Sequence, residues 1–364
     1  MPKFATLADI IRRAISERAF PAAAIEVGHH DGMLWSAAFG RLTYDPDSLE
    51  VTPGTVFDLA SLTKVIATAT LAMRAVDDGL LALDDRVGDR LAAWRGEDRQ
   101  PVTIADLLAH SSGLSAYLPF FRDHTGRIEY EQAICTIPLE YAPKTRSTYS
   151  DLGFILLGFI LEDVRQTGAV VSRPASRWDP ATSLAAQFRR LAAFVTDEPL
   201  TYNPPRSWRP VTAPTEVDSW RGRLLVGEVH DENAWALGGA AGHAGLFGTA
   251  AAVGAFARAM LRTIRGERIL ADPDTAREFI RKRDIPGSSR ALGWDTMLPT
   301  SSCGTLLSPT SIGHTGYTGT SLWIDWERDL YVAFLTNRVH PTRENTMIQQ
   351  IRPLVHNAVV EEIS

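Results

Sequence analysis

Two residues one helical turn apart, Ser61 and Lys64, are the strongest candidates for chemistry in this chain. They begin an apolar stretch at residues 61–73, which predicts a buried helix. Unpaired backbone N–H groups and the positive end of the helix dipole gather at such a start. Burial favours the neutral form of a lysine amine, so Lys64 could take the serine proton. The pair therefore predicts a nucleophile, a base and an anion-stabilising helix end in one place.

The same two residues also have an ordinary structural interpretation, in which Ser61 only caps a helix and Lys64 extends to solvent. Two further segments favour the chemical interpretation. Tyr149-Ser150-Asp151 stands just before a predicted helix at residues 152–164, and His314-Thr315-Gly316 ends a predicted strand. In chain order the segments read S-x-x-K, Y-x-[N/D] and [K/H]-T-G, a combination that is far more specific than any one of them.

This combination resembles the penicillin-recognising serine hydrolases of class C β-lactamase type, a family that includes D,D-peptidases, D-aminopeptidases and β-lactamase-fold esterases. Residues 102–114 are similar to the family's TI-x-DLL-x-H-x-SGL stretch, residues 79–85 to its G-x-L-x-LDD turn, and residues 242–247 to its AGGL segment. The resemblance extends from residue 22 to residue 355 and is weakest across residues 172–223. It implies a β-lactamase/transpeptidase-like fold.

The resemblance also implies a role for each matching residue. Ser61 corresponds to the nucleophile that is acylated, Lys64 to the residue that holds or removes its proton, and Tyr149 to the general base in acylation. A lysine ammonium favours the anion of a neighbouring phenol, so Lys64 and Tyr149 can pass a proton as a coupled pair. The backbone N–H groups of Ser61 and of Tyr317, on an edge strand, correspond to the oxyanion hole.

Two residues depart from the β-lactamase pattern in ways that bear on the substrate. Asp151 stands where the family has asparagine, which removes an amide donor and adds a negative charge near the acyl group. His314 stands where the family has lysine, and an unperturbed histidine is mostly neutral at pH 7. A neutral His314 suits the carboxylate of a penicillin less well than a lysine would. Both changes favour an esterase or a peptidase-like relative.

The remaining expected substrate contacts lie outside the three motifs. Thr315 and Gly316 continue the strand after His314, and Tyr117 is expected at the rim of the cleft. Arg343, or else Arg338, could supply a carboxylate contact, although both also fit the description of solvated arginines beside a helix start.

Strand patterns cluster at the two ends of the chain, with helical patterns between them. The fold class expected is α+β, with an antiparallel sheet built from both termini, flanked by helices, and an inserted mainly helical domain. Residues 1–60 and 250–364 would form the sheet domain and residues 61–249 the helical domain, in which residues 172–223 predict an irregular loop with one short helix. The expected strands are residues 22–27, 33–39, 311–315, 321–325 and 330–336.

Composition excludes several classes of function. With 364 residues and a net charge of −6, the chain lacks the basic character of proteins that bind nucleic acid or anionic membranes. Its longest strongly apolar run, residues 154–161, is too short to span a bilayer, and residues 6–15 predict an amphipathic helix instead of a signal peptide. Cys135 and Cys303 predict two separate reduced thiols. We therefore expect a cytoplasmic protein.

Metal and cofactor chemistry is not expected. Neither H-E-x-x-H nor paired C-x-x-C motifs occur, and the glycines of residues 238–245 do not match a nucleotide-binding pattern. The expected partner is a small-molecule ester, amide or β-lactam, and the sequence is silent on the oligomeric state.

The leading prediction is a carboxylesterase with weak β-lactamase activity. A D-amino-acid peptidase or amidase, or a genuine class C-like β-lactamase, are alternatives that use the same groups. Two alternatives from other classes are a non-catalytic ligand-binding relative of the same fold and a metal-dependent hydrolase.

Overall fold

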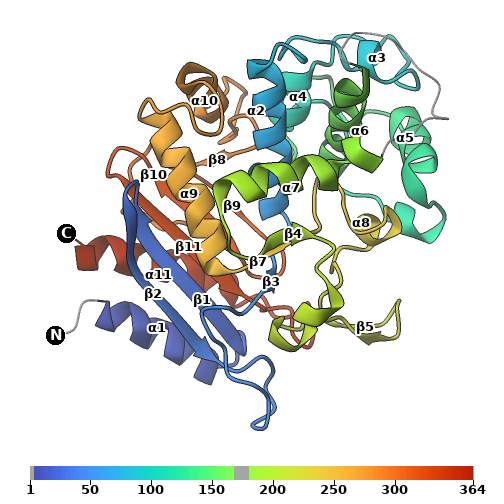
Figure 1. Cartoon of the computed structure of the whole chain (residues 1–364). Coiled ribbons are helices and arrows are strands. Elements are labelled where there is room, and N and C mark those ends of the chain that lie inside the picture. Colours follow the sequence, from blue (N-terminus) through green and yellow to red (C-terminus); the bar gives the residue numbers. More distant parts are fainter. Residues whose placement is uncertain (1–3, 168–179, 364) are drawn as a thin grey trace.

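A six-stranded antiparallel sheet joins the two ends of the chain in the computed structural model, which describes residues 4–167 and 180–363 (Figure 1). The strand order is β2-β1-β11-β10-β9-β8, so the N-terminal hairpin pairs directly with a C-terminal strand. This arrangement confirms the α+β fold and the sheet expected from both termini. The strands are β1 (Ala22–His29), β2 (Gly32–Gly40), β8 (Asp295–Thr296), β9 (Ile312–Thr315), β10 (Ser321–Asp325) and β11 (Leu330–Thr336).

Helices cover both faces of this sheet because side chains alternate along the buried strands. Val332 and Phe334 of β11 pack into a core with helices α1 (Ala5–Ser16) and α11 (Ile348–Ile363). The intervening Ala333 and Leu335 join a second core with helix α9 (Ala250–Ile264). The predicted N-terminal amphipathic helix is therefore a folded part of the sheet domain. Thr249 caps α9, accepting a hydrogen bond from the Ala252 amide at 3.1 Å.

Helices and short turns make up most of the region between the terminal strands. Two small sheets complete it, one in the order β3-β7-β4 and the other formed by β5 and β6. The helical elements are η1 (Lys64–Ala69), α2 (Thr70–Asp77), α3 (Val87–Arg90), α4 (Ile104–Leu108), η2 (Phe120–Arg122), α5 (Gly126–Thr136), α6 (Asp151–Thr167), η3 (Pro180–Thr182), α7 (Leu184–Val195), η4 (Arg206–Val211), α8 (Glu232–Ala236) and α10 (Pro273–Ile280). The strands are β3 (Phe57–Asp58), β4 (Leu200–Tyr202), β5 (Val217–Asp218), β6 (Arg223–Leu224) and β7 (Leu246–Gly248).

The stretch expected as an irregular loop is more regular than its composition indicates. Residues 172–179 lie outside the described residues. The rest of residues 172–223 contains the predicted short helix as α7, and also β4, which pairs with β7. The boundaries proposed for two domains stay a prediction. The main core holds side chains from the sheet and from the middle helices together.

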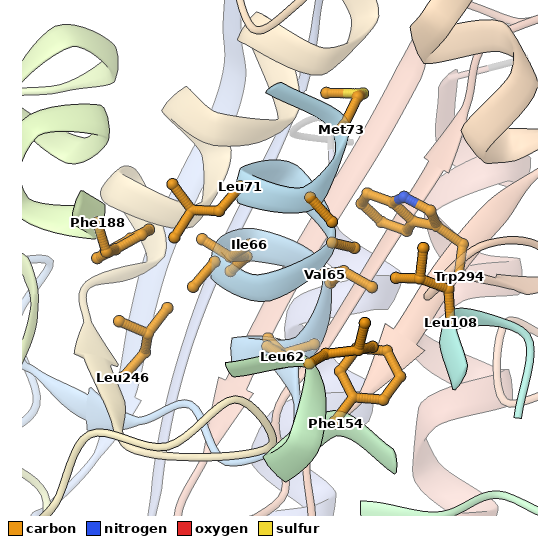
Figure 2. Close-up of a cluster of buried hydrophobic side chains, with 14 of the residues drawn as sticks. Leu62, Val65, Ile66, Leu71, Met73, Leu108, Phe154, Phe188, Leu246 and Trp294 are labelled. Carbon is orange, nitrogen blue, oxygen red and sulfur yellow. The ribbon is translucent and has the colours of Figure 1, made fainter. Parts of the chain in front are cut away.

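The helix that carries the candidate nucleophile is buried on every side, as its sequence predicts. Figure 2 shows Leu62, Val65 and Ile66 packed among side chains from other elements, including Phe154 of α6 and Trp294. Its first part, η1, is a π-helix, a wider turn that occurs frequently at functional sites. Cys135 and Cys303 are both free and buried. Among the described residues, no helix combines the length and apolar character needed to cross a membrane.

Candidate active site

Ser61 lies at the junction between strand β3 and helix η1, on a backbone held by its neighbours. Ala60 just before it has a φ of 47°, which is uncommon for a residue with a side chain. The Asp58 carboxylate accepts a hydrogen bond from the Ala60 amide at 2.8 Å, and the Leu59 amide donates to Leu246 O at 2.9 Å. These bonds hold the turn that presents the Ser61 hydroxyl.

Lys64 is completely buried, and its amine contacts three oxygens. Lys64 Nζ donates to Ser61 Oγ at 2.9 Å and to His243 O at 3.1 Å, and it forms an ion pair with Asp151 Oδ1 at 2.7 Å. Burial by itself would lower the pKa of Lys64, but Asp151 and Tyr149 outweigh burial and raise it. The resting lysine is therefore an ammonium. The expectation of a neutral amine was wrong, because burial alone was considered and the neighbouring carboxylate was not.

Tyr149 completes a group of three side chains with Ser61 and Lys64. Its hydroxyl interacts with both the Ser61 hydroxyl and the Lys64 amine. Its ring lies near two cations, 4.7 Å from Lys64 Nζ and 5.1 Å from the guanidinium carbon of Arg290. Burial raises the pKa of Tyr149, Lys64 opposes that change, and the Asp151 carboxylate adds to it. The resting tyrosine is therefore a neutral phenol beside an ammonium.

Two buried histidines flank the Tyr149 ring, with ring centres 4.7 Å away for His110 and 5.7 Å away for His314. His110 Nδ1 accepts a hydrogen bond from the Ser150 amide at 3.0 Å, and His314 Nδ1 donates to Thr315 O at 2.9 Å. Burial, together with the charges of Arg290 and Lys64, holds the pKa of each histidine well below its usual range. His314 is therefore neutral, as expected, because of burial as well as its ordinary pKa.

The turn between β9 and β10 is hydrogen-bonded to the chain just before Ser61. Thr318 Oγ1 donates to Asp58 O at 2.7 Å, and Thr320 Oγ1 donates to Leu59 O at 3.0 Å. Gly316 is needed at this contact, because a Cβ there would lie 2.6 Å from Leu59 O.

The two amides expected in the oxyanion hole belong to this junction. The N–H groups of Ser61 and Tyr317 donate to no acceptor within residues 4–167 and 180–363. Tyr317 was expected on an edge strand, but it lies in the turn that follows β9 (Ile312–Thr315).

Tyr117 was expected at the rim of the cleft, and that placement stays a prediction. Its side chain is 41% exposed. Burial of the remaining surface raises the pKa of its hydroxyl, and Glu232, Asp231 and Asp151 contribute in the same direction.

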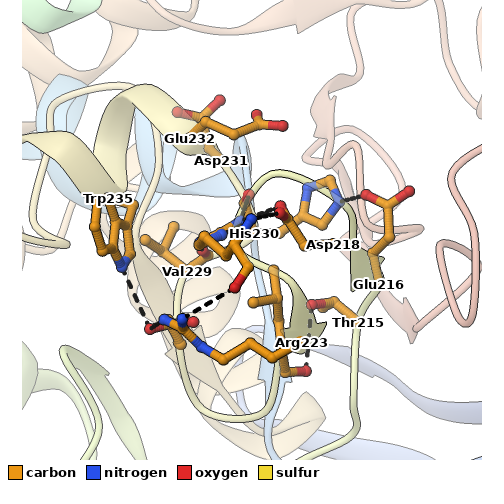
Figure 3. A network of polar contacts seen from close by, with 12 residues as sticks. Thr215, Glu216, Asp218, Arg223, Val229, His230, Asp231, Glu232 and Trp235 are labelled. Carbon is orange, nitrogen blue, oxygen red and sulfur yellow. Dashed lines mark hydrogen bonds and ion pairs between the residues drawn. The ribbon is translucent and has the colours of Figure 1, made fainter. Parts of the chain in front are cut away.

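Two protein carboxylates hold Arg343, and its predicted contact with a substrate carboxylate stays a prediction. Arg343 Nε lies 2.6 Å from Glu216 Oε2, and Arg343 Nη2 lies 2.7 Å from Glu232 Oε1. Figure 3 shows Glu216 also facing the His230 ring, at 2.9 Å. The alternative, Arg338, donates to three backbone carbonyls, including Tyr317 O at 2.8 Å. Both arginines therefore support the structure around the site.

Three further groups belong to the site, and sequence reasoning missed the two arginines among them. Arg290 faces the Tyr149 ring and forms no ion pair within the part of the chain that the structure describes. The His243 carbonyl binds Lys64, and the His243 ring contacts Asp231 at 2.8 Å. Arg352 of α11 donates to Gly316 O at 2.7 Å. The family-like segment at residues 242–247 pointed to the neighbourhood of His243, whereas no sequence signal marks either arginine.

A separate cluster brings together potential metal ligands from two turns of the sheet. His29, His30 and Asp329 place one ligand atom each within 4.8 Å of one another. Both ring nitrogens of His30 already contact carboxylates, Asp329 at 2.5 Å and Asp31 at 3.1 Å. The cluster contributes no atom to the site around Ser61.

Comparisons with known proteins agree with the geometry. The sequence matches the family described as "Beta-lactamase" over residues 7–355. It is 31% identical over 327 residues to an Escherichia coli (strain K12) protein with the provisional name D-alanyl-D-alanine carboxypeptidase, covering 80% of this chain and 71% of that protein.

Solved structures at lower identity share the fold. The hydrolase EstCE1, which has promiscuous acyltransferase activity, superposes with a TM-score of 0.74 at 18% identity, covering 98% of this chain and 97% of the other. A class C β-lactamase from Rhodobacter sphaeroides gives a TM-score of 0.73 at 19% identity, covering 98% and 99%.

Proposed function

The chain belongs to the β-lactamase family of serine hydrolases, and from that membership we propose that Ser61 is acylated by the substrate with Lys64 and Tyr149 as its proton-transfer partners. The observation that carries the proposal is the 2.9 Å contact between Lys64 Nζ and Ser61 Oγ, with the Tyr149 hydroxyl interacting with both groups. Nucleophile and base within hydrogen-bonding distance are the geometric requirement for this chemistry.

In the acylation step, the reactive state is the one in which the Lys64–Tyr149 pair has lost one proton. Ser61 Oγ attacks the substrate carbonyl carbon as its proton passes to the Tyr149 oxygen. The Ser61 and Tyr317 amides donate to the carbonyl oxygen, which becomes negative. The bond to the leaving group then breaks, and the leaving group takes the proton from Tyr149. Lys64 stabilises the Tyr149 phenolate before and after this transfer.

Deacylation repeats these transfers with water as the nucleophile. Water adds to the acyl carbon as Tyr149 takes one of its protons, and the ester bond to Ser61 Oγ breaks. The serine oxygen recovers the proton from Tyr149, and the carboxylic acid product leaves. The same residues thus act as base and then as acid.

Carboxylic esters are the leading substrate class, with β-lactams as weak substrates. Two observations support a neutral ligand. His314 is neutral, and the guanidinium of Arg343 forms ion pairs with Glu216 and Glu232. His314 stands on β9 where the family has lysine, so β9 supplies no cation that would bind a substrate carboxylate.

Cleavage of D-alanyl peptides is the second candidate, and two specific observations favour it. One is the relative with the provisional name D-alanyl-D-alanine carboxypeptidase. The other is Arg290, a half-buried guanidinium beside Tyr149 with no ion-pair partner in the described chain. Such a group could bind the terminal carboxylate of a peptide.

A labelling and turnover experiment tests the mechanism and ranks the substrates. Wild type, Ser61→Ala and Tyr149→Phe would be incubated with a fluorophosphonate and with a fluorescent penicillin, and any adduct located by mass spectrometry. Turnover would be measured on p-nitrophenyl esters, nitrocefin and D-alanyl-D-alanine peptides. We expect an adduct on Ser61, no turnover by Ser61→Ala, and a loss of about 10²- to 10⁴-fold in Tyr149→Phe. Turnover that survives Ser61→Ala would contradict the proposal, and chelator-sensitive turnover would indicate metal catalysis.

A further inference from the structure

Arg352 extends from the C-terminal helix α11 to the backbone of the turn that carries Tyr317. Its Nη2 donates to Gly316 O at 2.7 Å and to Thr320 O at 2.9 Å. The side chain is buried, and it forms no ion pair with any carboxylate of the described chain. A buried guanidinium without an anionic partner is costly, so its position calls for an explanation.

The carbonyl that Arg352 binds belongs to the same peptide group as the Tyr317 amide. Gly316 O also accepts a hydrogen bond from the Gly319 amide at 3.1 Å. Hydrogen bonds in a chain polarise one another, so a cationic donor on the carbonyl makes the N–H of that peptide a stronger donor. That N–H, on Tyr317, has no acceptor in the described part of the protein.

We propose that Arg352 is a positioning residue of the oxyanion hole, where it orients and polarises the Gly316–Tyr317 peptide so that the Tyr317 amide binds the developing oxyanion more strongly. This inference rests on the proposed acyl-enzyme function. Arg352 would contribute to the oxyanion hole through the Gly316–Tyr317 peptide, without touching the substrate.

The charge that this role requires is present at neutral pH. Burial, and to a smaller extent the neighbouring Arg338, lowers the pKa of Arg352 to about 9. That value leaves the guanidinium protonated at pH 7. The negative charge that develops on the substrate carbonyl oxygen would then form near an uncompensated buried cation, which favours the transition state over the neutral substrate.

Arg338 provides a matched control within the same turn. It is also an arginine, it is also largely buried, and it donates to Tyr317 O at 2.8 Å. Tyr317 O, however, belongs to the peptide that carries the Thr318 amide, not the Tyr317 amide. A general loss of turn stability should follow from replacing either arginine, whereas a weaker oxyanion hole should follow only from replacing Arg352.

The test compares acyl-enzymes of wild type, Arg352→Met, Arg352→Lys and Arg338→Met. Each protein would be acylated with a slowly hydrolysed cinnamoyl ester, and the acyl carbonyl stretch recorded by infrared difference spectroscopy. Stronger hydrogen bonds to the carbonyl oxygen lower this frequency. We expect Arg352→Met to raise the frequency and to slow acylation by about 10- to 100-fold with little change in KM, compared with about 10²- to 10³-fold for loss of a whole oxyanion donor.

The variants separate the possible outcomes. Arg352→Lys keeps a cationic donor, so its frequency and rate should lie between those of wild type and Arg352→Met. Arg338→Met should lower thermal stability and keep the wild-type frequency. If folded Arg352→Met shows the wild-type frequency and acylation within about twofold of wild type, the inference is overturned while the proposed function stands. If wild type forms no adduct on Ser61, both are overturned.

Discussion

The carboxylate of Asp151 lies 2.7 Å from the amine of Lys64, and this ion pair raises the pKa of the buried amine. Asp151 is the first residue of helix α6, where the helix dipole favours a negative charge. The pair explains how a fully buried lysine stays protonated. It also replaces the amide that family relatives are expected to carry at this position.

Replacing Asp151 with asparagine should move the pH dependence of the reaction toward acid. The Asp151 charge raises the pKa of both Lys64 and Tyr149. Without that charge, the Lys64–Tyr149 pair loses its proton at lower pH, so the rising limb of kcat/KM should shift down by about one pH unit or more. The measurement is a pH–rate profile for a neutral ester, with Asp151→Glu as the control that keeps the charge. An unchanged rising limb in Asp151→Asn would show that the ion pair does not control the base.

Replacing Arg290 with glutamine should discriminate between the two substrate classes. A charge-assisted hydrogen bond to a carboxylate contributes about 1.5–3 kcal/mol, so KM for a D-alanyl-D-alanine peptide should rise about 10- to 100-fold. The quantity to measure is the ratio of kcat/KM for that peptide to kcat/KM for a neutral p-nitrophenyl ester, because Arg290 also lies beside Tyr149. Arg290→Lys should preserve part of the ratio. Equal losses on both substrates would exclude a carboxylate-binding role.

Replacing Gly316 with alanine should disturb the oxyanion hole through a steric contact. The added Cβ would lie 2.1 Å from Thr320 Oγ1 and 2.6 Å from Leu59 O, so the turn and the chain before Ser61 must move apart. Misplacement of reacting groups by about 1 Å can cost about 10²-fold in rate. We expect a loss of that order in kcat, measured by ester hydrolysis. Gly32→Ala is the control, because its Cβ would meet no atom within 4 Å; equal activity of the two variants would contradict the prediction.

Replacing His356 with glutamine should weaken the acid sensitivity of folding. Burial, and to a smaller extent Arg352, lowers the pKa of His356 to about 3. As the pH falls below about 6.5, the unfolded chain binds a proton at this residue and the folded chain does not, so acid destabilises the fold. Between pH 6 and pH 4, the free energy of unfolding should therefore fall less steeply in the variant than in wild type, by about 1 kcal/mol per pH unit. Urea denaturation at several pH values measures both slopes, and parallel slopes would refute the assignment.

Local patterns were enough to predict five of the six strands of the main sheet and the pairing of Ser61 with Lys64. Strands β1 and β11 are apolar and buried along almost their whole length, because one set of side chains packs against α1 and α11 and the other against α9. Ser61 and Lys64 share one helical turn, so their contact follows from helix geometry alone. Tyr149 could be assigned to the same site only through the family resemblance, because no local rule joins residues so distant in sequence.

Charge states and pairings were decided by the tertiary structure. Whether Lys64 is charged depends on Asp151, and whether Arg343 is free depends on Glu216 and Glu232. Arg352 reaches the Gly316 carbonyl only because α11 packs against the sheet. Spacing along a chain specifies which face a side chain occupies, since helices and strands have fixed periods. The electrostatic field at a buried group is the sum of the contributions of its neighbours. Those neighbours come from the whole chain, and only folding decides which they are.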